Sequence, residues 1–159
     1  MSNLITSTTI STNIPLRQVL SEDFKLDLPV EGGWGYNRED SIIVKKPTGP
    51  IPFDLVGLEY VIVEKRIYEE LIIFRGKGNG FADIKWDLIK QNIITDNKRR
   101  LDHLIFKVSA HKESDFESLK QEFGKGFGTP GFDLAAHTKK HRHLQWSYET
   151  EFWFDISDV

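Results

Sequence analysis

The sequence predicts an α+β fold, a single domain with a mainly antiparallel β-sheet of about five or six strands and one or two helices on one face. Three observations predict it. Short segments that alternate apolar and polar residues recur along the chain, which is typical of half-buried strands. The segment 114–123 has helical periodicity instead. Strands and helices do not alternate regularly, which argues against a doubly wound parallel sheet.

A chain of 159 residues favours one domain. Residues 1–13 are rich in Ser, Thr and Asn and are predicted to form a flexible N-terminal tail or a weakly held edge, so the domain is expected over 14–159. The proline-rich segment 47–52 is a rigid connection, because three prolines fix φ and remove hydrogen-bond donors. It is the most plausible point for a division, but we expect none.

The first half of the chain predicts several short strands. Apolar residues alternate over 24–28, and 41–45 is typical of a short buried strand. The β-branched run 56–64 is also predicted to be a strand. The segment 67–74 is open between a strand and a short helix, because periodicity cannot decide so short a run.

The second half contains the clearest elements. Segments 84–94 and 101–109 flank turn residues and predict a β-hairpin. In the helix predicted over 114–123, Ser114 and Glu117 have the spacing of a capping box, and Gly124 is placed to end the helix. A helical turn is one interpretation of 132–140.

The last segment, 144–155, has the most regular alternation in the chain and predicts a long strand. One face is expected to be buried and carries Leu144, Trp146, Tyr148, Thr150, Phe152 and Phe154. The other face, expected to be wet, carries Gln145, Ser147, Glu149, Glu151, Trp153 and Asp155. Any exposed edge of so long a strand could pair with a second copy, so a homodimer stays open.

The composition excludes several classes. The chain has no cysteine, which excludes disulfides, thiolate zinc sites and a cysteine nucleophile. Its net charge of −3 does not steer it toward nucleic acid. The N-terminus has neither a signal peptide nor an anchor pattern, and no apolar run approaches a membrane span. We therefore expect a soluble cytoplasmic protein with no membrane partner.

Three histidines near the C-terminus, His137, His141 and His143, are candidate metal ligands. On a helix, the first two would lie one turn apart on one face, and neutral imidazoles bind zinc, nickel or copper. Basic neighbours oppose a cation, and the simpler interpretation is a solvated basic loop. We expect no cofactor. If the histidine cluster binds one, it would be a divalent transition metal.

The same segment is a candidate anion or nucleic-acid site. Lys139, Lys140 and Arg142 form a basic run, and Trp146 follows closely. Cations beside stacking surfaces are typical of single-stranded nucleic-acid grooves. Acidic residues in the next strand could instead neutralise the run, because a short charge run in an acidic chain is usually surface.

The candidate residues for binding a protein partner lie outside this basic run. Trp153, Glu149 and Glu151 share the face of the last strand that is expected to be wet, and Trp34 and Tyr36 lie on a glycine-rich loop. An exposed Trp in an acidic field suits a basic partner. The alternative is that Trp153 packs beneath the N-terminal segment and that Trp34 closes one end of the core.

These observations predict a small binding or interaction protein without catalytic activity, which could neutralise a basic protein partner. The sequence leaves two alternatives, a metal-dependent hydrolase using His137, His141 and His143, and a single-stranded nucleic-acid-binding module using 139–143. A catalytic pair is not indicated, since the adjacent Asp102 and His103 would point to opposite faces of a strand.

Overall fold

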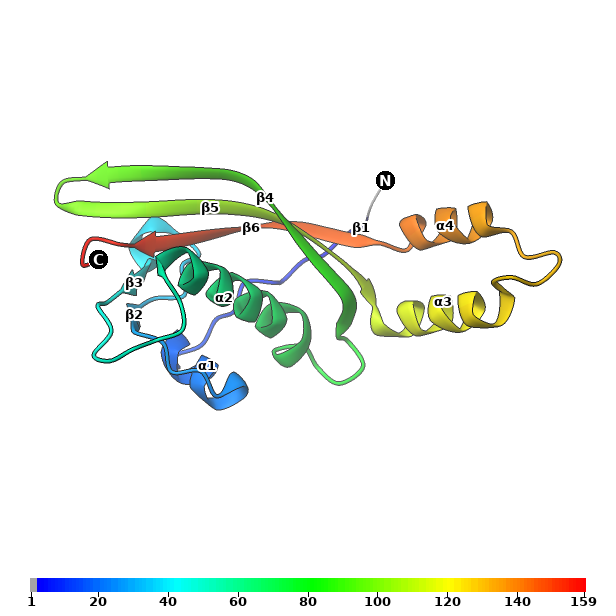
Figure 1. The fold of residues 1–159 in the computed structure, drawn as a ribbon, viewed down its shortest axis with the longest axis horizontal. Helices are drawn as coiled ribbons and strands as arrows, with labels where there is room; N and C mark the ends of the chain where they lie inside the picture. Colours follow the sequence, from blue (N-terminus) through cyan, green and yellow to red (C-terminus); the bar gives the residue numbers. More distant parts are fainter. Residues whose placement is uncertain (1–2) are drawn as a thin grey trace.

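The computed structural model describes residues 3–159 and confirms the α+β class (Figure 1). Its described part contains four α-helices and a six-stranded, mostly antiparallel sheet. The strands are β1 (Asn3–Leu4), β2 (Val30–Gly32), β3 (Ile42–Val44), β4 (Phe81–Asp96), β5 (Arg99–Lys112) and β6 (Trp146–Asp155). The helices are α1 (Leu16–Phe24), α2 (Leu55–Tyr68), α3 (Glu113–Gly126) and α4 (Leu134–His143), with a short 3₁₀ helix at Arg38–Asp40 and a π-helical turn at Glu69–Ile73.

The sheet has the strand order β2-β3-β6-β5-β4, and β1 also pairs with β6. The pairings β1–β6 and β3–β6 are parallel, and the others are antiparallel. The predicted last strand is confirmed as β6, but it lies inside the sheet, with β5 on one side and β1 and β3 on the other. Dimerisation through its edge, which the sequence left open, is therefore not available.

The prediction of a strand over 56–64 is wrong, because this run belongs to α2. The Asp54 side chain caps the helix by accepting a hydrogen bond from the Gly57 N–H, 2.7 Å away. Leu58, Ile62 and Ile67 recur near helical spacing and are buried against the sheet. Burial of this face overrides the β-branched propensity, and the open segment 67–74 continues as helix into the π-helical turn.

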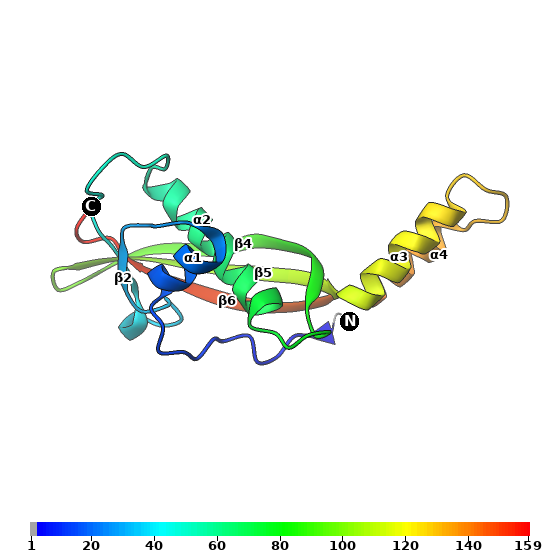
Figure 2. The same cartoon turned by 90° about the horizontal axis from the view of Figure 1, so that it is seen from below.

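The prediction of a strand over 24–28 is also wrong. Leu16, Val19 and Leu20 form the buried face of α1, which ends at Phe24. Lys25 then takes a left-handed conformation, with φ of 56°, and the chain runs without a strand until β2. The predicted short strand over 41–45 is confirmed as β3. Helices α1 and α2 lie on the same face of the sheet (Figures 1 and 2).

The predicted β-hairpin is confirmed as β4 and β5, joined by a tight turn in which Asn97 has a positive φ of 56°. The hairpin register shifts twice, between Ala82 and Lys85 and between Leu88 and Lys90. Such β-bulges re-aim side chains and bend the strand. Both irregularities lie in β4, the outermost strand.

Helices α3 and α4 form a hairpin that extends from the end of the sheet (Figure 2). It connects β5 to β6, which are themselves antiparallel neighbours. The predicted helix over 114–123 is confirmed, but its caps are not: α3 begins at Glu113 after Lys112 and continues through Gly124 to Gly126. The helical interpretation of 132–140 is confirmed by α4, in which the Asp133 side chain accepts from the Ala136 N–H.

The described part of the expected tail, residues 3–13, runs along the sheet (Figure 1). Ile5 is buried and the Ile10 N–H donates to the Tyr36 hydroxyl, so this stretch contributes to the core. Residues 1–2 lie outside the described residues. Among residues 3–159, every helix is too short or too polar to cross a bilayer.

A buried charged pair lies between α2 and the sheet. The Arg66 guanidinium is fully buried, 3.3 Å from the Glu70 carboxylate, and donates to the Thr150 hydroxyl and to the Trp34 carbonyl. Its carbon Cζ also lies 3.4 Å from the Phe152 ring centroid. Because buried charges are costly without partners, this arrangement fixes how α2 sits on the sheet.

Candidate metal centre at the base of the helical hairpin

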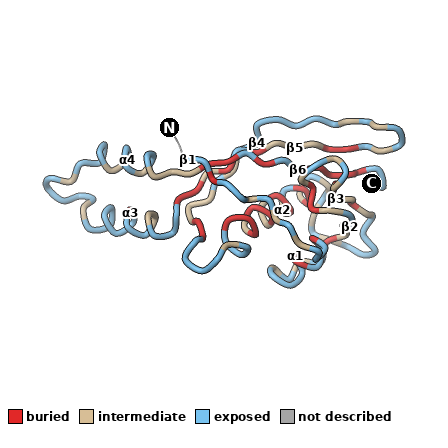
Figure 3. The backbone as a smooth tube through the Cα atoms, turned by 180° about the vertical axis from the view of Figure 1, so that it is seen from behind, coloured by how far each residue is buried: buried red, intermediate tan, exposed pale blue. Residues whose placement is uncertain are grey.

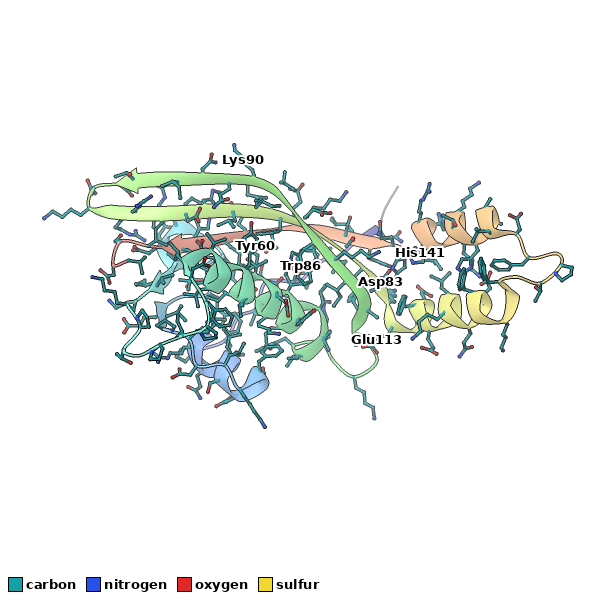
Figure 4. The ribbon with its side chains drawn as sticks, in the orientation of Figure 1. Tyr60, Asp83, Trp86, Lys90, Glu113 and His141 are labelled. Carbon is teal, nitrogen blue, oxygen red and sulfur yellow. The ribbon has the colours of Figure 1, made fainter. Side chains whose placement is uncertain are left out.

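Asp83, His111 and His141 meet where the helical hairpin joins the sheet. Each offers one ligand atom, and the three atoms lie within 4.8 Å of one another. The Asp83 Oδ2 atom is 3.2 Å from His111 Nδ1 and 3.4 Å from His141 Nε2. Figure 4 shows Asp83 at the start of β4 and His141 at the end of α4, close to each other.

Local backbone structure brings the three residues together. Asp83 lies in the first β-bulge of β4 and has a positive φ of 53°, an uncommon conformation that Asp tolerates better than most residues. The bulge turns its carboxylate toward β5, where His111 is the register partner of Ala82. His141 arrives from the last turn of α4. Three elements distant in sequence therefore supply one side chain each.

The hydrogen bond of His111 fixes the proton on its ring. The Nε2 atom lies 2.8 Å from the backbone carbonyl of His141, which can only accept, so Nε2 carries a hydrogen. In neutral His111, the Nδ1 atom then presents a lone pair toward the Asp83 carboxylate. His111 is fully buried, and its Nδ1 has no hydrogen-bond partner among the described residues.

Two acceptors that face each other in a buried site need a positive charge between them. Either a second proton makes His111 an imidazolium paired with Asp83, or a cation binds between the two atoms. Metal-binding histidines commonly donate their other ring N–H to a backbone carbonyl, as His111 does. The hydrogen bond of His111 therefore leaves its Nδ1 atom in the orientation that a metal ligand would have.

Two of the three separations between the ligand atoms are close to those around a tetrahedral ion. Zinc binds imidazole nitrogens and carboxylate oxygens at about 2.0 to 2.2 Å, which separates neighbouring ligand atoms by about 3.3 to 3.5 Å. The two distances from Asp83 Oδ2, 3.2 and 3.4 Å, lie close to this separation. Three protein ligands would leave one position of the tetrahedron open.

The electrostatic surroundings keep His141 able to bind. Burial, with the adjacent His111 ring as the next cause, lowers the pKa of His141 below its ordinary value. The imidazole is therefore neutral at physiological pH, the form that binds metals. The cationic group of Lys85 lies 3.8 Å from the other carboxylate oxygen of Asp83 and opposes a metal there. The side chain of Lys85 is exposed and can move away.

The other two histidines proposed from the sequence lie apart from this group. His137 packs between Phe123 and Phe132 inside the helical hairpin, and its Nδ1 atom is 3.7 Å from Glu122. His143 is exposed at the end of α4. Of the predicted ligand set, the structure places His141 alone beside other potential ligands.

The basic run has a structural role in α4. Its last turn carries Lys140 and Arg142, whose positive charges complement the helix dipole. Lys140 pairs with Glu122 at 2.9 Å, while Lys139 and Arg142 are exposed. Trp146 is partly buried, edge-on to Phe81, with the Lys112 ammonium over its ring. The structure therefore does not align these side chains into a stacking groove.

Both tryptophans proposed as anchors are buried in the structure, and the ring of Trp153 contacts His103 and Arg38. Trp34 exposes 6% of its surface and donates from its indole nitrogen to the Ile14 carbonyl. Trp153 exposes 9% and stacks on His103 at 3.7 Å, so it is not a free anchor on a wet face. The Tyr36 hydroxyl donates to Glu70 beside the buried Arg66.

The two acidic residues of that proposed surface are exposed. Glu149 and Glu151 point to the outer face of the sheet, and the Glu151 carboxylate accepts a hydrogen bond from the His103 ring, 2.8 Å away. They could still contact a basic partner. However, the aromatic side chains expected to anchor it belong to the body of the protein.

Sequence reasoning missed Asp83 and His111. His111 lies just after the predicted strand 101–109, but nothing in the sequence indicates which residue of a neighbouring strand faces it. The signal for Asp83 is subtle: Phe81 and Ile84 break the period-2 alternation at the point where the bulge occurs. His141 became a candidate only through its histidine neighbours, which have other contacts.

The protein thus has an α+β fold and, at the base of the helical hairpin, a group of two histidines and one carboxylate. Comparison of the chain with protein-family models, curated proteins and solved structures finds no match.

Proposed function

We propose that this protein binds one divalent transition-metal ion through Asp83, His111 and His141, with zinc as the preferred ion. The observation that supports the proposal most strongly is the buried Nδ1 atom of His111, which has no hydrogen-bond partner and lies 3.2 Å from the Asp83 carboxylate. A cation between these atoms would satisfy both. It would also connect α4 to the β-hairpin at the base of the helical hairpin.

The first test is calorimetric titration of metal-free protein with zinc and with cobalt. We expect one ion per chain, and the cobalt complex should show the strong visible absorption of a tetrahedral site. Asp83→Asn and His141→Ala should each weaken zinc binding by at least about 100-fold, because even loss of an outer partner typically costs 10- to 100-fold. These two positions are partly exposed, so the variants should fold.

Matched controls separate this centre from the one proposed from the sequence. Asp87→Asn changes a nearby exposed carboxylate of β4, and His143→Ala removes an exposed histidine of the same helix. Both should bind zinc as tightly as the wild type. The proposal is overturned if no ion binds at stoichiometric ratio, or if Asp83→Asn and His141→Ala bind like the controls. His111 would then be an imidazolium paired with Asp83.

A metal-dependent hydrolase is a second candidate, and one observation favours it. Asp83 lines a surface hollow of about 640 Å³ together with Glu113 and Glu117, which are carboxylates of the kind that serve as general bases. The open position of the centre would face solvent near this hollow. Hydrolysis of ester and phosphoester substrates that needs zinc and is lost in Asp83→Asn would support it, and zinc binding without any such activity would contradict it.

A protein partner that is basic, a cytoplasmic location and a nucleic-acid ligand stay predictions from the sequence. Glu149 and Glu151 are the exposed residues that support the first, and Lys139 and Arg142 those that support the last.

A further inference from the structure

The outer edge of the sheet is formed by β4, a strand of 16 residues. Among the described residues, β4 pairs with β5 on one side and with no strand on the other. Figure 3 shows that the outer part of this strand is exposed. A long strand edge presents a row of backbone donors and acceptors that another strand can pair with.

Apolar side chains accompany this free edge. Leu88, Ile89 and Ile93 expose 41, 52 and 50% of their surfaces. Leu88 is the register partner of Phe106, whose ring contacts Tyr60 of α2 edge-on at 6.2 Å. Tyr60 is itself exposed, so an apolar strip runs from α2 to the edge of the sheet. Such a strip beside an unpaired edge is typical of an interaction site.

The charged side chains of β4 are complementary to those of a second copy of β4 that runs antiparallel to it. Asp87 and Lys90 face the outer side of the sheet, opposite Lys107 and Ile105 of β5. If two copies of β4 paired antiparallel about a two-fold axis between residues 88 and 89, each Asp87 would lie opposite the Lys90 of the other copy. The same register places Leu88 opposite Ile89 and Ile84 opposite Ile93, and it places no like charges opposite each other.

The second bulge of β4 makes this register self-consistent. In a regular strand, Asp87 and Lys90 would point to opposite faces, because side chains alternate. The register shift between Leu88 and Lys90 inserts one extra residue and returns both charges to the same face. Trp86 and Gln91 likewise share the inner face and would lie opposite each other.

We propose that two copies of this protein pair through the outer edges of β4, in the register that sets Asp87 opposite Lys90, and form one continuous sheet. The two-fold axis is perpendicular to the sheet, so both α2 helices lie on the same face and the two apolar strips meet. In this register the charged and apolar side chains of one β4 edge are complementary to those of a second copy. This complementarity favours a second copy over an unrelated peptide. This proposal does not depend on the metal centre.

Charge reversal tests the register. Sedimentation equilibrium with a chelator present excludes metal-bridged association. The wild type is expected to dimerise with rising concentration.

Lys90→Glu and Asp87→Lys should each raise the dissociation constant at least about tenfold, because each creates two like-charge pairs. The double variant Asp87→Lys/Lys90→Asp restores opposite charges and should dimerise like the wild type. Lys98→Glu, at the turn of the hairpin, is the control of equal charge change.

A distance measurement provides an independent readout. Because the chain has no cysteine, Asn92→Cys accepts a single spin label. Asn92 would lie opposite Lys85 of the other copy, so the two labels would be separated by the length of 85–92. Because the second bulge adds a residue without a register step, this stretch spans the same length as His103–Ser109 of β5, about 20 Å at about 3.4 Å per residue.

Two results would overturn the proposal. One is a monomer at all concentrations, in which case the lysines and bulges of β4 protect the edge instead, as such features do in many proteins. The other is a dimer that both single charge reversals leave intact, or that gives a label distance far from about 20 Å, because it would use a different surface.

Discussion

The ring of His111 donates a hydrogen bond to the backbone carbonyl of His141, 2.8 Å away, so one candidate ligand holds the backbone of another. Any ion bound there would couple the end of β5 to the last turn of α4. Asp83 completes the group from β4. The base of the helical hairpin is thus the place where metal binding would change the stability of the fold.

We expect zinc to slow amide hydrogen exchange in α4 more than in α1, because the ion would bind one end of α4 and not α1. With free zinc at about 100 times the dissociation constant, the linked stabilisation is about 2.7 kcal/mol. Exchange followed by mass spectrometry would measure it, with His141→Ala as the control that should not respond. Equal protection of both helices, or none, would contradict the position of the site.

The stability of the protein should fall with rising pH because of Glu59. This side chain exposes only 3% of its surface. Burial, together with the facing carboxyl of Asp102, raises the pKa of Glu59 to about 9. The folded protein therefore holds a proton that the unfolded chain releases. The contribution of this proton to the free energy of unfolding is fully present below about pH 4.5. It is lost progressively as the pH rises to about 9, and the free energy of unfolding falls by up to about 1.4 kcal/mol per pH unit.

Glu59→Gln should remove this dependence, since the amide does not titrate. Denaturation by urea at pH 5 and pH 8.5 would show a smaller loss of the free energy of unfolding in the variant than in the wild type. Glu64→Gln, on the same helix but partly exposed, should behave like the wild type. An unchanged pH dependence in Glu59→Gln would show that Glu59 is ionised in the folded protein.

Loss of the buried cation should destabilise the protein strongly. Arg66→Met would leave the carboxylate of Glu70 buried without its charged partner, and we expect a loss of about 3 to 5 kcal/mol in the free energy of unfolding. Arg17→Met removes an arginine that pairs with Asp27 at the surface and should cost less than about 1 kcal/mol. Similar losses in the two variants would contradict the importance of the buried pair.

His137 offers a test of what the histidines of α4 do. Its ring packs between Phe123 and Phe132, and its Nδ1 atom is buried without a hydrogen bond. His137→Phe should preserve the helical hairpin, which circular dichroism and hydrogen exchange would report, and should bind zinc like the wild type. A loss of zinc binding would instead support the ligand set proposed from the sequence.

The elements that the sequence predicted correctly are those whose pattern repeats over many residues. The alternation is clearest in β5, where Leu104, Phe106 and Val108 are buried on one face. Two bulges interrupt it in β4, and the second half of β6 is buried on both faces. The run 56–64 failed because its β-branched residues indicate a strand, while burial against the sheet and the Asp54 cap select a helix. Propensity is a weak guide where tertiary packing decides.

The candidate site was predicted only in part for a different reason. Clustering along the chain brought His137, His141 and His143 together, but a helix of the length of α4 separates its ends and faces. His137 turns to the aromatic cluster, and His143 turns to solvent. Asp83 joins the site through a bulge, and bulges depend on pairing with a neighbouring strand that a single segment does not reveal.

The helical hairpin occupies the position of a turn. Strands β5 and β6 pair up to Ala110 and Trp146, so a connection of a few residues would be long enough to join them. The segment 113–144 therefore makes a long excursion between two adjacent strands. A chain with a short turn in place of the helical hairpin would keep Asp83 and His111 but lack His141, so the proposed metal centre exists only as long as the excursion does.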